Sequence, residues 1–242
     1  MKHKSYSSWV LFCLVWLVGS AVSGFGQVSA AGVNYQKVAL LKWYAANQTG
    51  TTFSVGSGPQ GVAFDGANIW VANGGSANVT KLRAADGAIL GTFSVGSNPF
   101  GVAFDGANIW VTNFFGNNVT KLRAADGAIL GTFSVGSNPF GVAFDGANIW
   151  VTNNGSNNVT KLRAADGANL GTFSVGSGPF GVAFDGANIW VTNIGSANVT
   201  KLRAADGANL GTFSVGFGPQ GVAFDGANIW VANGADVTVS KL

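Results

Sequence analysis

Apolar and polar residues along this chain repeat with a period of 40 residues, and each period contains four short apolar or alternating runs. The motif Phe-Ser-Val-Gly begins at Phe53, Phe93, Phe133, Phe173 and Phe213. The longer block GVAFDGANIWV begins at Gly61, Gly101, Gly141, Gly181 and Gly221. A fixed period of this length indicates a repeat architecture in which each unit is one supersecondary element.

The first unit shows what each repeat is predicted to form. Its four runs are Val62–Phe64, Ile69–Val71, Val79–Arg83 and Leu90–Val95. The turn signals between them are Asp65-Gly66, Asn73-Gly74 and Asp86-Gly87. Short β-branched or alternating runs separated by Asp-Gly and Asn-Gly are typical of hairpins. Each unit is therefore predicted to be a four-stranded antiparallel meander without a helix.

Stacking of these meanders predicts an all-β fold, a five-bladed β-propeller over residues 52–242. One meander cannot bury both of its faces, whereas radially stacked units can, and a unit of about 40–45 residues with four strands is typical of propeller blades. The repeats supply five first, second and third strands but only four fourth strands after them. Thr52–Val55 has the fourth-strand sequence and precedes the first block, so we predict that it closes the ring.

The N-terminal residues 1–30 have the layout of a secretory signal peptide. Basic Lys2 and Lys4 precede the apolar run Trp9–Val18, and small residues lead to a cleavage signal ending at Ala30. The apolar run is too short for a permanent membrane anchor. We therefore expect a secreted, periplasmic or cell-surface protein with no permanent anchor after cleavage. Residues 31–51 then form an N-terminal extension, whose strand-like segment Lys37–Tyr44 we expect at the outer rim or the seam.

The repeat unit resembles a known family. Its second copy reads Gly101–Gly106 (GVAFDG), Ile109–Asn113 (IWVTN) and Val119–Leu122 (VTKL), and all five units match over about residues 52–242. This pattern is similar to the YVTN-type β-propeller repeats, which are related to NHL repeats and to the propeller of virginiamycin B lyase. The resemblance implies a propeller fold and a secreted or surface protein. The lyase relatives use a histidine and acidic residues around magnesium at the central channel.

The residue inventory of the chain after the leader excludes several chemistries. The only histidine and the only cysteine, His3 and Cys13, lie in the leader, and the sequence contains no glutamate. A Ser-His-Asp triad, a cysteine nucleophile, a thiolate or histidine zinc site and a glutamate acid/base pair are therefore excluded. No histidine of the lyase relatives can be carried over, and no cofactor is implied.

Composition and charge narrow the class of partner. The 37 glycines among 242 residues, with 47% apolar and 10% charged residues, indicate an ordered, turn-rich chain. Without Lys2 and Lys4 the chain keeps 11 basic residues against 10 aspartates. A nearly neutral chain gives no reason to expect nucleic acid as a partner.

Three sets of repeated polar residues have both a structural and a functional interpretation. Asp65 and its copies start Asp-Gly hairpins, but around a ring they could also approach one another as a cation site. Lys81 and Arg83 with their copies are interpreted as a solvated face near the rim. Asn78-Val79-Thr80, its copies and Asn47-Gln48-Thr49 fit the N-glycosylation pattern, although duplication of one chance match gives the same result.

The copies differ mainly in two connections, at positions 57, 58, 60, 72 and 74–77 and their equivalents, with one further difference at position 89. In a meander these connections emerge on one face, and loops on a rigid scaffold commonly carry binding, although drift in exposed loops gives the same pattern. The candidate ligand-binding residues on this variable face are Gln60, Phe100, Phe140, Phe180, Gln220, Phe114, Phe115, Asn154 and Ile194. Asp236 lies on the same face.

Positions 60 and 72 change together, since Phe at the first accompanies Thr at the second, and Gln accompanies Ala. If Asp65-Gly66-Ala67 is the turn, positions 60 and 72 are cross-strand neighbours, although shared ancestry of the outer units explains the pattern equally well. The phenylalanines of three adjacent blades would then give the rim an asymmetric face or plug the mouth of the channel.

Three functional hypotheses follow from this sequence. The first is a secreted, non-catalytic binding scaffold for a protein or neutral glycan through the variable face. The second is a metal-assisted lyase or hydrolase with an aspartate-held cation, as the lyase resemblance suggests. The third is a structural cell-surface protein in which nearly identical blades exchange between chains.

Overall fold

The computed structural model describes residues 50–242. The predicted leader 1–30 with Cys13, the segment Lys37–Tyr44 and the Asn47 glycosylation pattern lie outside these residues. The chain divides into two compact units, Met1–Phe53 and Ser54–Leu242, and every described strand belongs to the second. Among residues 50–242, no helix is long and apolar enough to cross a membrane.

Each 40-residue repeat forms one antiparallel sheet whose strands follow chain order. Sheet 1 contains β1 (Pro59–Phe64), β2 (Asn68–Asn73), the short 3-10 helix η1 (Gly74–Ser76), β3 (Asn78–Arg83) and β4 (Ile89–Ser94). Sheet 2 contains β5 (Pro99–Phe104), β6 (Asn108–Asn113), β7 (Asn118–Arg123) and β8 (Ile129–Ser134). Sheet 3 contains β9 (Pro139–Phe144), β10 (Asn148–Asn153), β11 (Asn158–Arg163) and β12 (Asn169–Ser174). Sheet 4 contains β13 (Pro179–Phe184), β14 (Asn188–Asn193), β15 (Asn198–Arg203) and β16 (Asn209–Ser214). Sheet 5 has three strands, β17 (Pro219–Phe224), β18 (Ile229–Asn233) and β19 (Thr238–Lys241).

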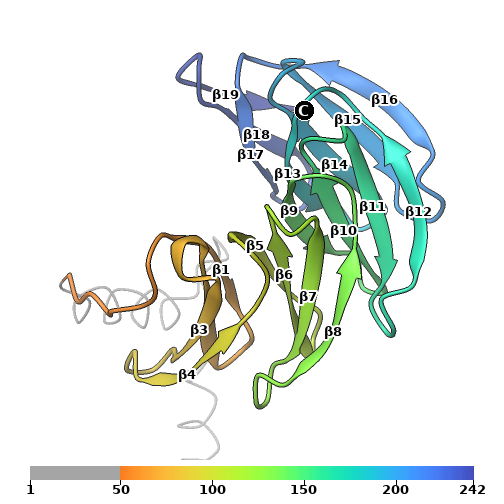
Figure 1. Ribbon diagram of the computed structural model, residues 1–242. Helices are drawn as coiled ribbons and strands as arrows, with labels where there is room; N and C mark the ends of the chain where they lie inside the picture. Colours follow the sequence, from red (N-terminus) through yellow and green to blue (C-terminus); the bar gives the residue numbers. More distant parts are fainter. Residues whose placement is uncertain (1–49) are drawn as a thin grey trace, which may run out of the picture. The chain divides into compact units, whose positions relative to one another are not determined.

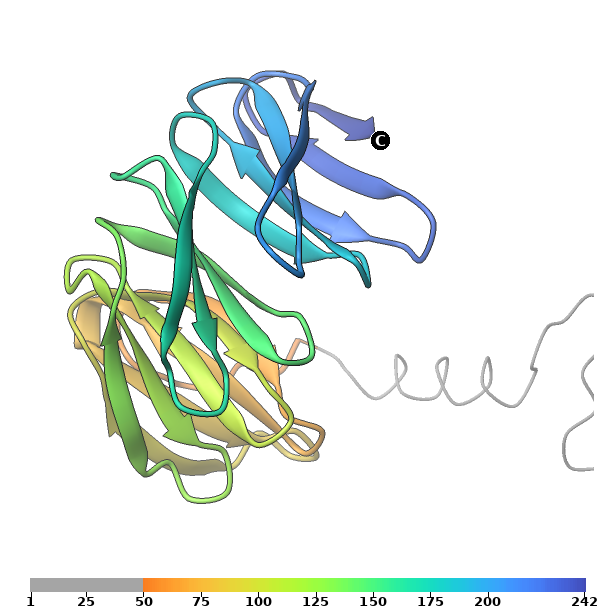
Figure 2. The ribbon, with the colours of Figure 1, turned by 90° about the vertical axis from the view of Figure 1, so that its right-hand side faces the viewer.

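These strands confirm the predicted meander, and they place the hydrophobic core between successive sheets (Figure 1). At the first junction Trp70 and Val79 of sheet 1 pack with Ile109 and Leu122 of sheet 2. Equivalent clusters join sheets 2 and 3, 3 and 4, and 4 and 5. Because both faces of the middle strands are covered, β6 and β7 are buried along almost their whole length. The sheets therefore stack side by side as propeller blades do (Figure 2).

Lys81, Lys121 and Lys161 hold neighbouring sheets together, which corrects their interpretation as a solvated face. Lys241, in the last sheet, is exposed. Lys121 is only 5% exposed, and its Nζ donates hydrogen bonds to the carbonyl oxygens of Ala164 (2.6 Å) and Ala165 (3.0 Å) in sheet 3. The same ammonium lies 5.1 Å from the ring centroid of Trp110. Burial is acceptable because the charge is met by carbonyls and an aromatic face. The arginines do behave as a solvated face, since the exposed Arg123 pairs with exposed Asp126 at 2.8 Å.

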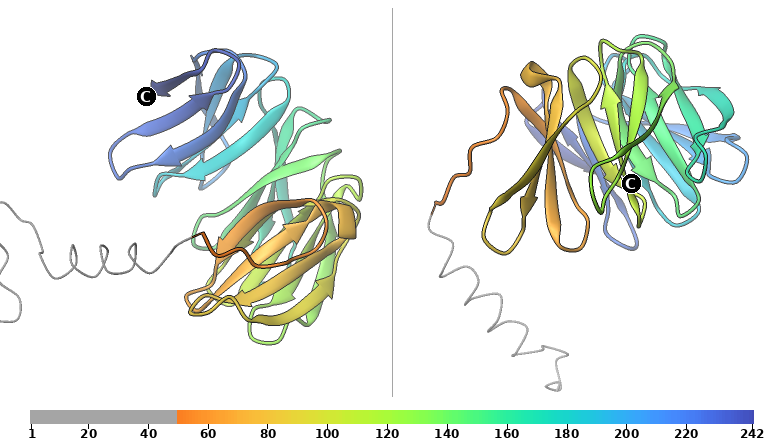
Figure 3. Two further views of the ribbon diagram at one scale, coloured as in Figure 1. Left: turned by 90° about the vertical axis from the view of Figure 1, so that its left-hand side faces the viewer. Right: turned by 60° about the horizontal axis from the view of Figure 1, so that its bottom comes forward.

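In the described residues, Thr52–Val55 does not pair with sheet 5, so the predicted closure of the ring is not formed. Residues 51–55 belong to no strand, and sheet 5 has three strands (Figure 3). A closed ring would cover the outer faces of sheets 1 and 5, and both faces are exposed. Phe64 in sheet 1 is 56% and Trp230 in sheet 5 is 39% exposed, whereas Trp150 in sheet 3 is fully buried. The two terminal sheets therefore present uncovered apolar faces.

The hairpin register differs from the expected one. Phe64 pairs with Ile69, so the turn contains four residues rather than three, and a bulge before Val62 brings Pro59 opposite Asn73. Positions 60 and 72 are therefore not a simple cross-strand pair. A bulge places two residues of one strand opposite one of the partner, so the backbone at position 61 also approaches position 72.

The threonines at position 72 of sheets 2, 3 and 4 bridge neighbouring sheets, whether Phe or Gln stands at position 60 of the next sheet. Thr152 Oγ1 accepts a hydrogen bond from the N–H of Gly141 (2.8 Å) and donates one to the carbonyl oxygen of Phe180 in the next sheet (2.8 Å). Thr112 and Thr192 make the same bridges to Phe140 and Gln220. Where alanine replaces threonine, at Ala72 and Ala232, the hydroxyl bridge is lost.

Restoring this bridge at the first junction should stabilise the protein. Ala72→Thr is expected to raise the free energy of unfolding by about 1 kcal/mol, the net value of a typical protein hydrogen bond. Thr152→Ala should lower it by a similar amount. Urea unfolding of both variants measures the effect. An Ala72→Thr protein that is no more stable than the wild type would contradict a stabilising role of the bridge.

Candidate binding face and the channel mouth

The two variable connections of each sheet lie together on one face. In sheet 1, the N–H groups of Gly74 and Gly75 donate to the carbonyl oxygens of Gly58 (2.8 Å) and Ser57 (2.9 Å). The N–H of Ser57 in turn donates to the hydroxyl of Ser76 at 2.7 Å. The connection entering the first strand is thus fastened to the one joining the second and third strands. Sequence variation is concentrated on this variable face.

The first strands of all five sheets line one cavity of about 490 Å³. Their equivalent positions contribute Gln or Phe, Gly and Val, namely Gln60–Val62, Phe100–Val102, Phe140–Val142, Phe180–Val182 and Gln220–Val222. A Cβ atom at Gly101 would meet the carbonyl oxygen of Phe140, so glycine lets neighbouring first strands approach closely. No charged side chain lines this channel, and its volume falls in the range of small-ligand pockets.

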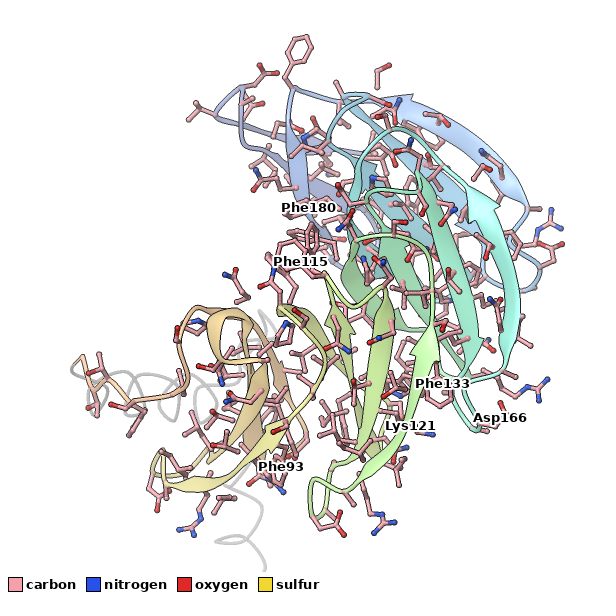
Figure 4. All side chains as sticks on the ribbon, in the orientation of Figure 1. Phe93, Phe115, Lys121, Phe133, Asp166 and Phe180 are labelled. Carbon is pink, nitrogen blue, oxygen red and sulfur yellow. The ribbon has the colours of Figure 1, made fainter. Side chains whose placement is uncertain are left out.

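An aromatic cluster occupies the part of the channel mouth formed by sheets 2, 3 and 4. The ring centroid of Phe140 lies 3.7 Å from that of Phe100 and 3.8 Å from that of Phe180. Phe114 lies edge-on to Phe140 at 5.9 Å and to Phe115 at 5.1 Å. Phe100, Phe140 and Phe180 line the cavity, whereas Phe114 and Phe115 extend the cluster beyond its lining; Figure 4 labels Phe115 and Phe180. Five of the candidate residues therefore form one continuous surface.

The remaining candidates lie at different distances from this cluster. Gln60 and Gln220 are exposed and line the channel on the side of sheets 1 and 5. Asn154 is half-buried, and its amide donates to the carbonyl oxygen of Pro179 at 3.3 Å. Ile194 is half-buried beside Gly178. Asn154 and Ile194 therefore hold neighbouring loops, and neither lines the channel.

The repeated aspartates lie on the connections between first and second strands, where each is occupied by its own hairpin. Asp145 accepts hydrogen bonds from the backbone N–H groups of Ala147 (2.9 Å) and Asn148 (2.7 Å) and from the indole N–H of Trp150 (2.7 Å). Among residues 50–242, no three aspartates gather where they could hold a metal ion. The hairpin interpretation of Asp65 and its copies therefore accounts for their position.

The electrostatics of this turn are those of a hydrogen-bonded carboxylate. Burial raises the pKa of Asp145, but the indole of Trp150 and the donors of Ala147 and Asn148 outweigh it and hold the pKa below its ordinary value. The hydrogen bond from the Trp230 indole is the largest cause that lowers the pKa of Asp225 as well. The indole partner of each aspartate lies beyond the Asp-Gly motif, so hairpin signals alone did not reveal it.

These lowered pKa values predict sensitivity to acid. An aspartate whose pKa is lower in the folded state contributes stability above its unfolded value of about 3.9, and that contribution is lost as pH falls toward the folded pKa. The free energy of unfolding is therefore expected to decline below about pH 4. Asp145→Asn should be less stable at pH 7 and decline less steeply. Urea unfolding at pH 7, 4, 3 and 2 tests this, and parallel profiles of the two proteins would contradict it.

The glycosylation-like triplets have a structural role in the sheets. The amide of buried Asn113 donates to Asn118 Oδ1 (2.7 Å) and to Thr120 Oγ1 (2.9 Å), so both key residues of one triplet are its acceptors. Asn118 Nδ2, the atom that would carry a glycan, donates to the carbonyl oxygen of Gly116 at 2.9 Å. The recurrence of this motif is therefore explained by packing between the second and third strands.

A second cavity, of about 470 Å³, lies between sheets 3 and 4 and has charged residues in its lining. Each of these is already engaged. Lys161 donates to the carbonyl oxygens of Ala204 and Ala205, and Arg203 pairs with Asp206 at 3.0 Å. The uncharged channel mouth is therefore the better candidate site.

Comparison with solved structures shows the fold. The hydrazine synthase of Kuenenia stuttgartiensis matches with a TM-score of 0.64 and 19% identity, covering 81% of this chain and 69% of that chain. A functionally unknown protein from Desulfotomaculum acetoxidans matches with a TM-score of 0.66 and 16% identity, covering 78% and 70%. A streptogramin B lyase structure matches with a TM-score of 0.63 and 20% identity, covering 78% and 70%. Residues 54–242 thus have a β-propeller-like fold. Neither the protein-family models nor the curated proteins gave a match.

Proposed function

We propose that this chain is a secreted, non-catalytic β-propeller of the YVTN type that binds a neutral partner, a protein or a glycan, through its variable face. The observation that carries the proposal is the uncharged channel mouth, where rings from three sheets form one aromatic surface. Exposed apolar patches rimmed by polar residues commonly mark interaction sites. Secretion and the resulting periplasmic, extracellular or cell-surface location rest on the leader sequence 1–30.

The proposal includes a ring of five blades, with Thr52–Val55 as the missing fourth strand of sheet 5. Its sequence is the same as that of Thr92–Val95. Residues 56–58 join Thr52–Val55 to β1, just as residues 96–98 join Thr92–Val95 to β5. The connection therefore has the length that every other junction uses. Closure would cover Phe64 and Trp230, whose counterparts in the other sheets are more deeply buried.

Similarity to a streptogramin B lyase supports the alternative of a metal-assisted lyase or hydrolase at the level of fold alone. The residues that could carry such chemistry do not fit it well. The carboxylates of the hairpin aspartates already accept several hydrogen bonds each, and the channel lining has no carboxylate. We therefore favour binding over catalysis.

The test of this proposal replaces all five rings of the cluster. Wild-type protein and a variant carrying serine at Phe100, Phe140, Phe180, Phe114 and Phe115 would be screened against arrays of neutral glycans and uncharged peptides. Ile129→Ser is the matched control, because Ile129 is 57% exposed on the outer strand β8 and lies in neither variable connection. We expect binding by the wild type and the control only. Equal binding by the five-serine variant with an unchanged circular dichroism spectrum would overturn the proposal.

A further inference from the structure

We infer that the channel mouth binds an uncharged peptide segment that inserts an aromatic side chain among the phenylalanine rings. This inference rests on the proposed function and narrows its partner to one class. The mouth has two chemically different sides, an aromatic side from sheets 2, 3 and 4 and an amide side from sheets 1 and 5.

The aromatic side is suited to a planar apolar group. Phe140 is at its centre and contacts Phe100, Phe180 and Phe114, so the cluster is a preformed surface. Phe115 extends it and is 67% exposed. Aromatic rings in contact gain stability beyond the burial of their area. A ring placed against Phe115 and Phe140 would cover apolar surface that now faces solvent.

The amide side is suited to a peptide backbone. Gln60 and Gln220 are exposed and line the same cavity. A carboxamide carries both a donor and an acceptor, which is the pair that a peptide unit presents. A backbone running along Gln60 and Gln220 would leave its side chains directed at the rings.

Charge and hydrogen-bonding capacity separate a peptide from the other candidates. No charged side chain lines the mouth, so a charged ligand group would lose hydration without gaining a partner. A glycan presents many hydroxyl groups, whereas the lining offers two carboxamides and otherwise only Phe, Gly and Val side chains. Phenylalanine has no hydrogen-bonding group with which to compensate. The lining therefore favours a neutral peptide over a glycan.

The test titrates three probes into ¹⁵N-labelled protein and follows amide shifts by NMR. The probes are N-acetyl-tryptophanamide, N-acetyl-lysinamide and maltotriose. We expect saturable shifts at the channel glycines with N-acetyl-tryptophanamide, and at least tenfold weaker binding of the other two. Phe140→Ser should weaken the binding of N-acetyl-tryptophanamide at least tenfold, and Phe140→Leu should weaken it less because leucine keeps apolar volume. Ile129→Ser should leave it unchanged.

The outcomes separate this inference from the proposed function. Maltotriose binding that depends on Phe140 would overturn the peptide inference while supporting a binding face. Preferential binding of N-acetyl-lysinamide, or no saturable binding of N-acetyl-tryptophanamide, would also overturn it. Folding of each variant is checked by its amide spectrum, and Phe140→Leu remains informative if Phe140→Ser does not fold. The proposed function itself is tested separately, by comparing the binding of the five-serine variant with that of the wild type on the arrays.

Discussion

Trp150→Ala is expected to destabilise the protein by about 3–5 kcal/mol, as for other large-to-small substitutions in cores. Trp150 is fully buried and belongs to the cluster that joins sheets 3 and 4. Its ring lies 5.6 Å from that of Phe173 and 5.1 Å from Lys161 Nζ, and its N–H donates to Asp145 at 2.7 Å. Alanine would remove all three contacts and leave a cavity between two sheets.

Urea unfolding followed by circular dichroism measures this loss. Trp150→Phe is the matched control, because it keeps an aromatic ring and removes the hydrogen bond to Asp145. It should cost about 1–2 kcal/mol, since the Asp145 carboxylate loses one donor of several. Equal losses for the two variants would show that the ring contributes little, contrary to the position of the core between sheets.

Lys121→Met is expected to be the next most damaging change, with a loss of about 2–3 kcal/mol. Methionine keeps the apolar stem but removes the ammonium, so the carbonyl oxygens of Ala164 and Ala165 lose their donor. A hydrogen bond from a charged group contributes about 1.5–3 kcal/mol, and the contact with the Trp110 face adds to it.

Lys201→Met supplies the comparison within the same protein. The ammonium of Lys201 lies 4.7 Å from the ring centroid of Trp190, but the described residues give it no carbonyl acceptor. Its replacement should therefore cost less than half as much as Lys121→Met in the same urea experiment. If both variants lost the same stability, the carbonyl hydrogen bonds would not be what makes the buried lysine favourable.

The period of 40 residues was sufficient to predict the sheets because each turn signal acts locally. Asp-Gly ends the first strand in all five copies, and an asparagine ends the second, so β1 to β19 begin and end within a few residues of the predicted runs. The variable face also followed from the alternation of connections in a meander, and the candidates at position 60 do line one cavity.

Contacts between repeats could not be predicted in the same way. The sequence predicts a solvated face at Lys81 and its copies because the third strand lies near the rim, and the acceptor of Lys81 is 43 residues away in the next sheet. Thr152 likewise donates to the carbonyl oxygen of Phe180 in the next sheet, a contact that no hairpin signal indicates. Neither residue carries a local signal of its partner.

Closure of the ring tests the central claim most directly, because the proposed five-bladed propeller needs Thr52–Val55 as the fourth strand of sheet 5. In sheet 4, Ser214 of β16 pairs with Asn198 of β15. In a closed ring the equivalent pair in sheet 5 would be Ser54 with Thr238. Facing residues have Cα atoms within the range that a disulfide spans. A Ser54→Cys, Thr238→Cys variant in a Cys13→Ser background would be oxidised and its mass compared before and after reduction. Asn198→Cys with Ser214→Cys is the positive control.

We expect a disulfide within one chain, formed as completely as in the control. Free thiols in the oxidised Ser54→Cys, Thr238→Cys protein, with a complete disulfide in the control, would contradict closure. Disulfide-linked dimers would also contradict it and would favour a structural protein assembled by strand exchange.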